Sequence, residues 1–333
     1  MAIEPTLLLS ARDVQRCVGI GEALETTEAS LRDHANGKVV LPTKVTLDMS
    51  GLGIPNWINA MPAYVAGSKM AGLKWIGGFV RDASAERLPF ILGLVVLTDP
   101  HTGVPAAIMD GAYITTLRTG AAAAIAAKYL ARKDASIVAL LGAGVQGRSA
   151  LLALSRLFRL TEVRIADVTE AARVHLAAEM EKALGIRMLA TDNCRKAVGE
   201  ADIVVTATTA DAPLVDDAWI GAGALVVSLG SYQELDTELV LRADKLVVDH
   251  REQSRHRGQL VKMYEAGLID DEAVFAQLGE IVAGQKPGRE DESERIVACL
   301  TGMALEDIAL AAKAYARAKE LGLGVGFNFL DGV

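Results

Sequence analysis

The feature that most constrains this sequence is a strand, a glycine-rich turn, a helix and a second strand between residues 136 and 167. The apolar run Ser136 to Leu141 leads into Gly142-Ala143-Gly144-Val145-Gln146-Gly147, which fits the pattern G-x-G-x-x-G. A helical stretch to about Arg159 and a β run from Val163 to Ala166 follow, and Asp167 comes directly after them. This order is typical of a dinucleotide-binding βαβ unit and is far more specific than the glycine motif alone.

Each part of this unit has a role in binding a dinucleotide. Gly142 permits a turn too tight for a Cβ atom, Gly144 lets the backbone approach a pyrophosphate, and Gly147 lets the helix pack closely on the strand. Unpaired N–H groups and the dipole at the start of the helix favour the phosphate charge. Asp167, 25 residues after Gly142, is placed to accept both ribose hydroxyls and would repel a 2′-phosphate. The sequence therefore predicts NAD(H) rather than NADP(H).

Composition limits the class of protein. A chain of 333 residues with 51% hydrophobic and 23% charged residues is long enough for two domains with a large core. The net charge of −8 argues against a nucleic-acid-binding face and favours small solutes as partners. No secretion signal and no apolar run of about 18 residues is present, so we expect no membrane span and a cytoplasmic location. Cys17, Cys194 and Cys299 are far apart, and neither a disulfide nor a metal site is expected.

The order of the expected elements indicates two domains. The first part of the chain has a helical segment at 10–36 and then β-type runs at 39–50, 57–66, 70–78, 90–98 and 104–109, and the turn at Asp99-Pro100 and Thr102-Gly103 between the last two runs predicts a hairpin. A buried small-residue helix from Ile114 to Ala131 leads to the glycine motif, after which strands and helices alternate as in a doubly wound parallel sheet. The predicted fold is α/β, with a Rossmann domain at 116–302 and an α+β domain at 1–115 that a C-terminal helix within 303–333 completes.

Several residues outside the glycine turn are candidates for chemistry. Lys74 lies within an apolar strand, so its ammonium must find a partner or line a cleft, or else extend from a strand edge to solvent. Arg118, near the start of the apolar helix, could bind a carboxylate or the cofactor phosphates, or form a structural salt bridge. Thr208, Ser228 and Gly230 follow two strands of the Rossmann sheet, at the edge where ligands bind.

Five motifs in order give the chain a resemblance to the ornithine cyclodeaminase and mu-crystallin family. The motifs are Gly72-Leu73-Lys74-Trp75, Thr98-Asp99-Pro100 with Thr102-Gly103, Thr115 to Ala121, Gly142 to Gln146, and Gly279 to Gly284. They cover nearly the whole chain, and within the family the sequence is similar to the branch of archaeal alanine dehydrogenase and ketimine reductases.

The resemblance implies a homodimer whose first domain binds substrate and forms the subunit interface. It assigns to Lys74 a hydrogen bond or proton transfer near the reacting carbon, and to Arg118 the substrate carboxylate or the cofactor pyrophosphate. The family's second basic residue corresponds to Lys44, which can pair with a carboxylate but lacks the fork of an arginine. With the edge residues, these assignments give the cofactor contacts Arg118, Thr119, Gly142, Ala143, Gly144, Val145, Gln146, Asp167, Thr208, Ser228 and Gly230.

Two further departures from the cyclodeaminases affect the expected reaction. Cyclodeaminases have a catalytic aspartate in the loop after the strand at 225–229, whereas here Ser231 or Tyr232 occupies that place in a loop about four residues shorter. Phe90 replaces a threonine on the cofactor side and makes the substrate pocket more apolar. Without the aspartate, deamination with ring closure is disfavoured.

We therefore predict an NAD(H)-dependent oxidoreductase that reduces a small 2-imino or 2-oxo acid, or a cyclic ketimine, to an amino acid. Lys74 and Arg118 are the expected catalytic residues, and Lys44, Phe90 and Ser231 complete the expected substrate site. Two alternatives stay open: an ornithine cyclodeaminase that forms proline and ammonia, and a binding protein without turnover, as mu-crystallin is for thyroid hormone.

Overall fold

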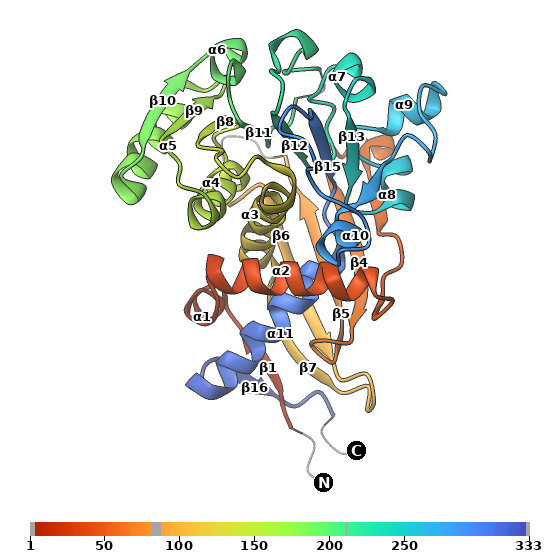
Figure 1. The fold of residues 1–333 in the computed structure, drawn as a ribbon. Helices are drawn as coiled ribbons and strands as arrows, with labels where there is room; N and C mark the ends of the chain where they lie inside the picture. The colour runs from red at the N-terminus through yellow and green to blue at the C-terminus, as the bar shows by residue number, and fades with distance from the viewer. Residues whose placement is uncertain (1–3, 81–87, 211, 331–333) are drawn as a thin grey trace. The chain divides into compact units, whose positions relative to one another are not determined.

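A computed structural model describes residues 4–80, 88–210 and 212–330 of the chain. The chain forms two compact units, the first made of Met1–Arg118 with Met303–Val333 and the second of Thr119–Gly302. Each unit contains one eight-stranded sheet, and Figure 1 shows the course of the chain through both. Helix α3 (Gly111–Leu130) begins in the first unit and ends in the second, in agreement with the small-residue helix predicted before the glycine motif.

The sheet of the first unit is mainly antiparallel. Its strand order is β16-β1-β7-β6-β5-β4-β2, with β3 paired to β4, and β1 runs parallel to β7. The predicted hairpin between β6 and β7 is confirmed, and Asp99 Oδ1 accepts the His101 N–H at 2.8 Å in its turn. The strands are β1 (Thr6–Leu9), β2 (Val39–Val40), β3 (Val45–Asp48), β4 (Trp57–Val65), β5 (Met70–Gly78), β6 (Ile91–Thr98), β7 (Pro105–Asp110) and β16 (Val325–Phe327).

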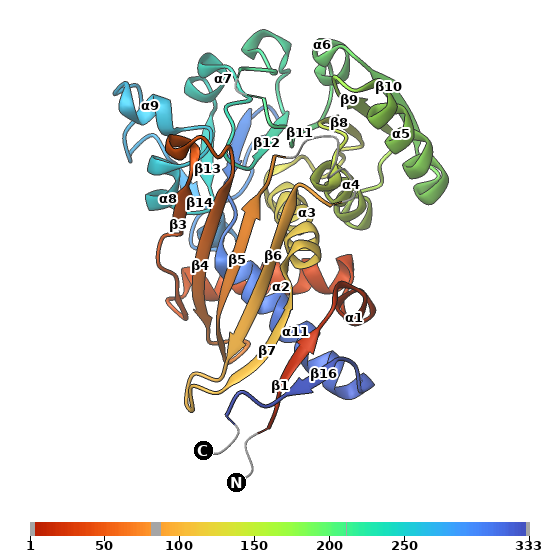
Figure 2. The ribbon, with the colours of Figure 1, turned by 180° about the vertical axis from the view of Figure 1, so that it is seen from behind.

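Helices cover one face of this sheet. They are α1 (Ala11–Cys17), α2 (Ile20–Ala35) and α11 (Ala304–Leu321), and a short 3-10 turn η1 (Ser50–Leu52) lies between β3 and β4. Helix α11 packs on β4, β5 and β6, and α2 packs on α11; Figure 1 shows these helices in front of the strands and Figure 2 shows the opposite face of the sheet. Successive side chains of β5 therefore have different surroundings: Lys74 contacts Asp307 of α11, whereas Trp75 is 41% exposed on the other face.

The second unit has the doubly wound parallel sheet that the sequence predicts. Every strand pair in the order β10-β9-β8-β11-β12-β15-β13-β14 is parallel. The strands are β8 (Ile137–Leu141), β9 (Glu162–Ala166), β10 (Arg187–Thr191), β11 (Ile203–Thr206), β12 (Leu225–Leu229), β13 (Lys245–Val248), β14 (Ala276–Gln277) and β15 (Ile296–Leu300). Between them run α4 (Val145–Leu157), α5 (Glu170–Leu184), α6 (Cys194–Val198), η3 (Asp217–Trp219), α7 (Thr237–Leu241), α8 (Arg251–His256), α9 (Val261–Glu265) and α10 (Leu278–Val282).

Some strands were not expected from the sequence. The most important is β15, a fully buried strand that lies between β12 and β13. Its apolar run is only five residues long, and periodicity alone does not distinguish such a run from part of a buried helix. Strands β1 and β16 at the edge of the other sheet were also missed. Within the described part of the chain, no helix combines the length and apolar character required to cross a membrane.

Candidate functional site

Lys74 is a buried cation with a carboxylate partner. Its side chain is 1% exposed, its Nζ lies 2.6 Å from Asp307 Oδ2, and it donates to the Thr115 hydroxyl at 3.3 Å. Strand β5 supplies Lys74, helix α11 supplies Asp307, and helix α3 supplies Thr115. Of the two alternatives left open by the sequence, the structure excludes a lysine that extends to solvent from a strand edge.

Arg118 shares the same carboxylate. Its Nε donates to Asp307 Oδ1 and its Nη1 to Glu306 Oε2, both at 3.1 Å. Arg118 is 7% exposed, Glu306 1% and Asp307 0%. The salt bridge considered for Arg118 from the sequence is therefore present. Lys74, Arg118, Glu306 and Asp307 form one buried group, which we call the ion-pair cluster.

The ion-pair cluster tunes the acidity of Lys74. The pKa of Lys74 is lowered to about 8, because burial and then the positive charge of Arg118 lower it more than Asp307 and Glu306 raise it. The pKa of Arg118 is also lowered by burial, but the charges and hydrogen bonds of Asp307 and Glu306 outweigh this effect and raise it overall. A lysine whose pKa lies near the working pH is suited to proton transfer, whereas the arginine remains charged.

Two further predicted residues of the substrate site, Lys44 and Phe90, directly precede strands of the same sheet. Lys44 directly precedes β3, in which Val45 pairs with Ala60 of β4. Met61, the residue of β4 after Ala60, pairs with Lys74 of β5. Phe90 directly precedes β6 and is 41% exposed.

The glycine turn has the geometry of a pyrophosphate-binding loop. Gly142 has a φ of 105°, and a Cβ atom there would lie 2.5 Å from the carbonyl oxygen of Ala207. A Cβ at Gly147 would collide with the carbonyl of Gly142, whereas a Cβ at Gly144 would point into open space. Helix α4 begins after Gly144, and the buried Oε1 of Gln146 has no hydrogen-bond partner among the described residues. These residues fit a dinucleotide, with the open side at Gly144.

Asp167 is tied to the glycine turn. Its Oδ2 accepts the N–H of Ala143 at 2.8 Å, and its Oδ1 accepts the N–H of Thr169 at 2.8 Å. Asp167 follows β9, and Ala143 follows β8, its parallel neighbour in the sheet. The side chain is half-buried, so the carboxylate both orders the turn and remains next to the edge at which a ribose binds.

The loops after β11 and β12 meet at a buried acid that the sequence analysis did not select. Glu234 is 0% exposed and accepts hydrogen bonds from the hydroxyl of Thr206 and the N–H of Thr208, each at 2.7 Å. The hydroxyl of Ser228, at 3.4 Å, points to the same carboxylate. Ser231 is instead exposed and accepts a hydrogen bond from Arg257 Nε at 3.2 Å. Thr208 and Ser228 thus lie together at this edge, as the sequence predicted, because both donate hydrogen bonds to Glu234.

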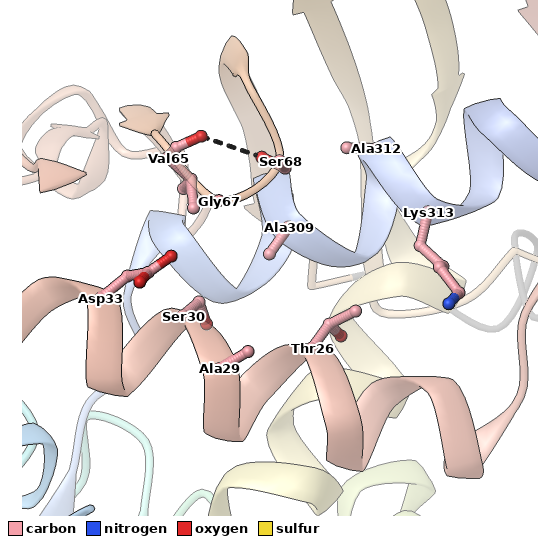
Figure 3. A pocket seen from close by; sticks show the side chains of 10 residues that line it. All are labelled: Thr26, Ala29, Ser30, Asp33, Val65, Gly67, Ser68, Ala309, Ala312 and Lys313. Atoms are coloured by element: carbon pink, nitrogen blue, oxygen red, sulfur yellow. Dashed lines mark hydrogen bonds between the residues drawn. The ribbon is translucent and has the colours of Figure 1, made fainter. Parts of the chain in front are cut away.

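A separate hollow of about 310 Å³ lies between α2, α11 and the β4–β5 turn. Figure 3 shows Asp33 and Lys313 at opposite ends of it. Its three hydroxyls donate to backbone carbonyls: Thr26 to Glu22, Ser30 to Thr27, and Ser68 to Val65. It contains no residue that the sequence predicted for the site. Among the described residues, no group of three or more His, Cys, Asp and Glu side chains is arranged to hold a metal ion.

Comparison with known proteins decides the family. The family model described as ornithine cyclodeaminase/mu-crystallin family matches residues 4–322. The chain belongs to the ornithine cyclodeaminase/mu-crystallin family. Within this family, the chain is 36% identical to an alanine dehydrogenase of Archaeoglobus fulgidus over 328 residues, which are 97% of this chain and 98% of that protein. The predicted family is confirmed.

Solved structures of the ornithine cyclodeaminase/mu-crystallin family have the same fold. The Δ1-pyrroline-2-carboxylate reductase of Thermococcus litoralis, in complex with NADH and L-proline, is 35% identical with a TM-score of 0.92, over 96% of this chain and 100% of that one. An archaeal alanine dehydrogenase dimer with bound NAD is 36% identical, also with a TM-score of 0.92, over 98% of this chain and 99% of that one.

Three acids in the candidate site were missed from the sequence. Glu306 and Asp307 lie in an alanine-rich helix that is buried for most of its length. Buried carboxylates require cationic partners, so two adjacent acids near the start of an alanine-rich helix were a signal that could have identified them. Glu234 has no comparable signal, because it lies in a polar loop whose path the sequence does not specify.

Proposed function

We propose that this protein is an NAD(H)-dependent oxidoreductase that reduces a small 2-imino or 2-oxo acid, or a cyclic ketimine, to the amino acid. The observation that carries the proposal is Lys74, a buried lysine with a pKa of about 8, in a chain that also has a complete dinucleotide-binding unit. Such a lysine can protonate a substrate at neutral pH. The relatives that are solved with NADH and L-proline or with NAD support the cofactor and the kind of substrate.

In the reductive direction, Lys74 supplies the proton and NADH, when bound, supplies the hydride. A 2-oxo acid would first condense with ammonia to an imine, with loss of water. The hydride from NADH would form the new C–H bond at the imine carbon, and the π electrons of the C=N bond would move to nitrogen. Lys74 Nζ protonates this atom and is left neutral beside Asp307. Solvent then returns the proton, which the Asp307 charge favours.

The substrate carboxylate is the proposed partner of Arg118 and Lys44. The ion-pair cluster contains two cations, Lys74 and Arg118, and two carboxylates, Glu306 and Asp307, so its charges balance. A substrate carboxylate adds one negative charge next to this balanced group. That charge raises the pKa of Lys74 and favours the protonated form that the reduction requires.

The cofactor site is proposed to be built from the glycine turn and the strand ends of the second unit. Residues 142–146 cradle the pyrophosphate, Asp167 accepts the adenosine ribose hydroxyls, and the edge at Thr208, Ser228 and Gly230 receives the nicotinamide half. Arg118 and Thr119, both in helix α3, are further proposed contacts of the cofactor. The carboxylate of Asp167 favours NAD(H), because it would repel a 2′-phosphate.

The first unit is proposed to bind substrate and to form a homodimer through the uncovered face of its sheet. The paired residues Val45, Ala60, Trp75 and Leu94 form a cross-strand row on this face. Val45 is 61% exposed, Trp75 41% and Leu94 49%. A second apolar row lies beside it and consists of Pro62, Leu73, Val96 and Ile108. A second copy of the chain is the proposed partner of this apolar face, and the archaeal alanine dehydrogenase relative is itself a dimer.

Trp75→Glu should convert the dimer into a monomer, because it places a charge in the middle of the apolar row. Light scattering after size-exclusion chromatography measures the mass directly. The matched control is Val174→Glu, which adds the same charge at a half-exposed valine of α5 in the other unit and should leave the dimer intact. A wild-type monomer, or a Trp75→Glu dimer at micromolar concentration, would contradict this interface.

The catalytic proposal is tested by the loss of NADH absorbance with purified protein. The substrate panel contains cyclic imino acids, and 2-oxo acids with ammonia or methylamine. We expect steady NADH consumption with at least one member of the panel and much slower consumption with NADPH. The absence of turnover with every member, despite measurable NADH binding, would overturn the proposal and favour a binding protein without turnover.

A further inference from the structure

Glu234 is a buried acid with three hydrogen-bond donors around it. It lies in the loop between β12 and α7. Its Oε2 accepts from the hydroxyls of Thr206 and Ser228, and its Oε1 accepts from the backbone N–H of Thr208. Thr206 and Ser228 are directly paired near the carboxyl ends of β11 and β12. The carboxylate therefore lies at the ligand-binding edge of the parallel sheet.

No cation balances this acid within the part of the chain that the structure describes. None of the ion pairs found there includes Glu234, and the guanidinium of Arg257 contacts Ser231 of the same loop instead. Burial raises the pKa of Glu234 above its ordinary value, and the hydrogen bonds from Thr208, Thr206 and Ser228, all of which donate to the carboxylate and stabilise the anion, offset only part of this rise. An unpaired buried charge is unfavourable for stability, so its position next to a binding edge suggests a function.

The position of Glu234 relates it to one half of the cofactor. The glycine turn and Asp167 belong to β8, α4 and β9, the half of the sheet that receives the adenosine diphosphate. The nicotinamide is then expected to bind at the other half of the sheet, which contains β11 and β12. NAD⁺ and NADH differ in charge at the nicotinamide ring, which is positive only in NAD⁺. A fixed negative charge in this half therefore stabilises bound NAD⁺ more than bound NADH.

We propose that Glu234 makes the protein bind NAD⁺ more tightly than NADH and thereby makes bound NADH a stronger hydride donor. The inference rests on the proposed function. Tighter binding of the oxidised form favours hydride transfer to the substrate by the same factor, because the two affinities and the redox equilibrium form a closed thermodynamic cycle. A tenfold preference would correspond to about 30 mV for a two-electron couple.

The test compares Glu234→Gln with Glu238→Gln. Glutamine has nearly the same shape as glutamate and removes the buried charge, whereas Glu238 is an exposed acid of α7 whose charge is screened by solvent. Calorimetric titration gives the dissociation constants of NAD⁺ and NADH for each variant. We expect the preference for NAD⁺ to fall by on the order of tenfold in Glu234→Gln and to remain unchanged in Glu238→Gln.

An unchanged preference in a folded Glu234→Gln protein would overturn the inference, even if both affinities decrease, because a purely structural acid affects both forms equally. Failure of the wild-type protein to bind either form would instead overturn the proposed function.

If Glu234→Gln does not fold, the wild-type preference is measured from about pH 8 down to about pH 4.3, the ordinary pKa of a glutamate, because burial holds the pKa of Glu234 above that value. It should decrease as Glu234 is protonated, and a constant preference would contradict the inference. The thiol of Cys299 also lies near Glu234, and burial raises the pKa of this thiol so that it stays neutral.

Discussion

Lys74→Met should lower kcat/KM for imino acid reduction by about 10²- to 10⁴-fold, the usual contribution of a positioned acid. Methionine fills similar space without a proton to donate. The loss should lie mainly in kcat, because Arg118 and Lys44 are still present to bind the substrate carboxylate. Steady-state kinetics with NADH measures both parameters. The control is Lys313→Met, which removes an exposed lysine of α11 and should have no effect on either parameter.

The same substitution also breaks a buried ion pair, which typically lowers stability by about 3–5 kcal/mol. The double variant Lys74→Met with Asp307→Asn separates this effect from catalysis. It leaves Arg118 paired with Glu306, so the charges in the cluster balance again and much of the stability should return. We expect activity to remain as low as in Lys74→Met. Recovery of activity together with stability would show that Lys74 supports the fold and is not the proton donor.

Asp307→Asn should move the alkaline limb of the pH profile of kcat/KM to lower pH. In the wild-type protein this limb should lie near pH 8, where Lys74 loses its proton. Asp307 raises the pKa of Lys74, against the lowering by burial and by Arg118, so loss of its charge lowers this pKa further. The limb should move by about one pH unit or more, the effect of a close charge in a buried site. Activity at about pH 7 should then decrease, because less Lys74 is protonated.

A matched control for Asp307→Asn is Glu320→Gln on the same helix. Glu320 pairs with Arg317 at 2.7 Å, and both side chains are more than half exposed, so this change should affect neither the pH profile nor stability beyond about 0.5 kcal/mol. If Asp307 only supported the fold, its substitution would lower the melting temperature and leave the alkaline limb in place. That result would contradict the assignment of Asp307 as the residue that sets the pKa of Lys74.

Much of the fold could be predicted from local sequence patterns. The glycine turn, the helix after it and Asp167 were located from the sequence because turn geometry and strand ends depend on neighbouring residues. The strand from Met70 to Gly78 and the hairpin at Asp99 were also predicted. The strand at Ile296–Leu300 was missed because a short apolar run has no distinctive period.

The partners of the candidate catalytic residues could not be predicted in the same way. Lys74 and Arg118 were selected from the sequence, but Asp307 is more than 180 residues away from either. Which carboxylate meets a buried cation depends on how α11 packs on β5, and this is set by tertiary structure. Glu234 was not selected for the same reason, since only the folded loop turns it inward beneath Thr206 and Ser228.

The most direct test of the central claim is whether hydride leaves NADH and remains in the product. The experiment uses NADH deuterated at the transferable position of the nicotinamide, together with the imino or oxo acid that supports turnover. Mass spectrometry of the amino acid product should show one deuterium at the carbon next to the carboxylate, with one NAD⁺ formed for each product molecule. Formation of proline and ammonia from ornithine with NAD, without net change in the cofactor, would contradict the claim and identify a cyclodeaminase.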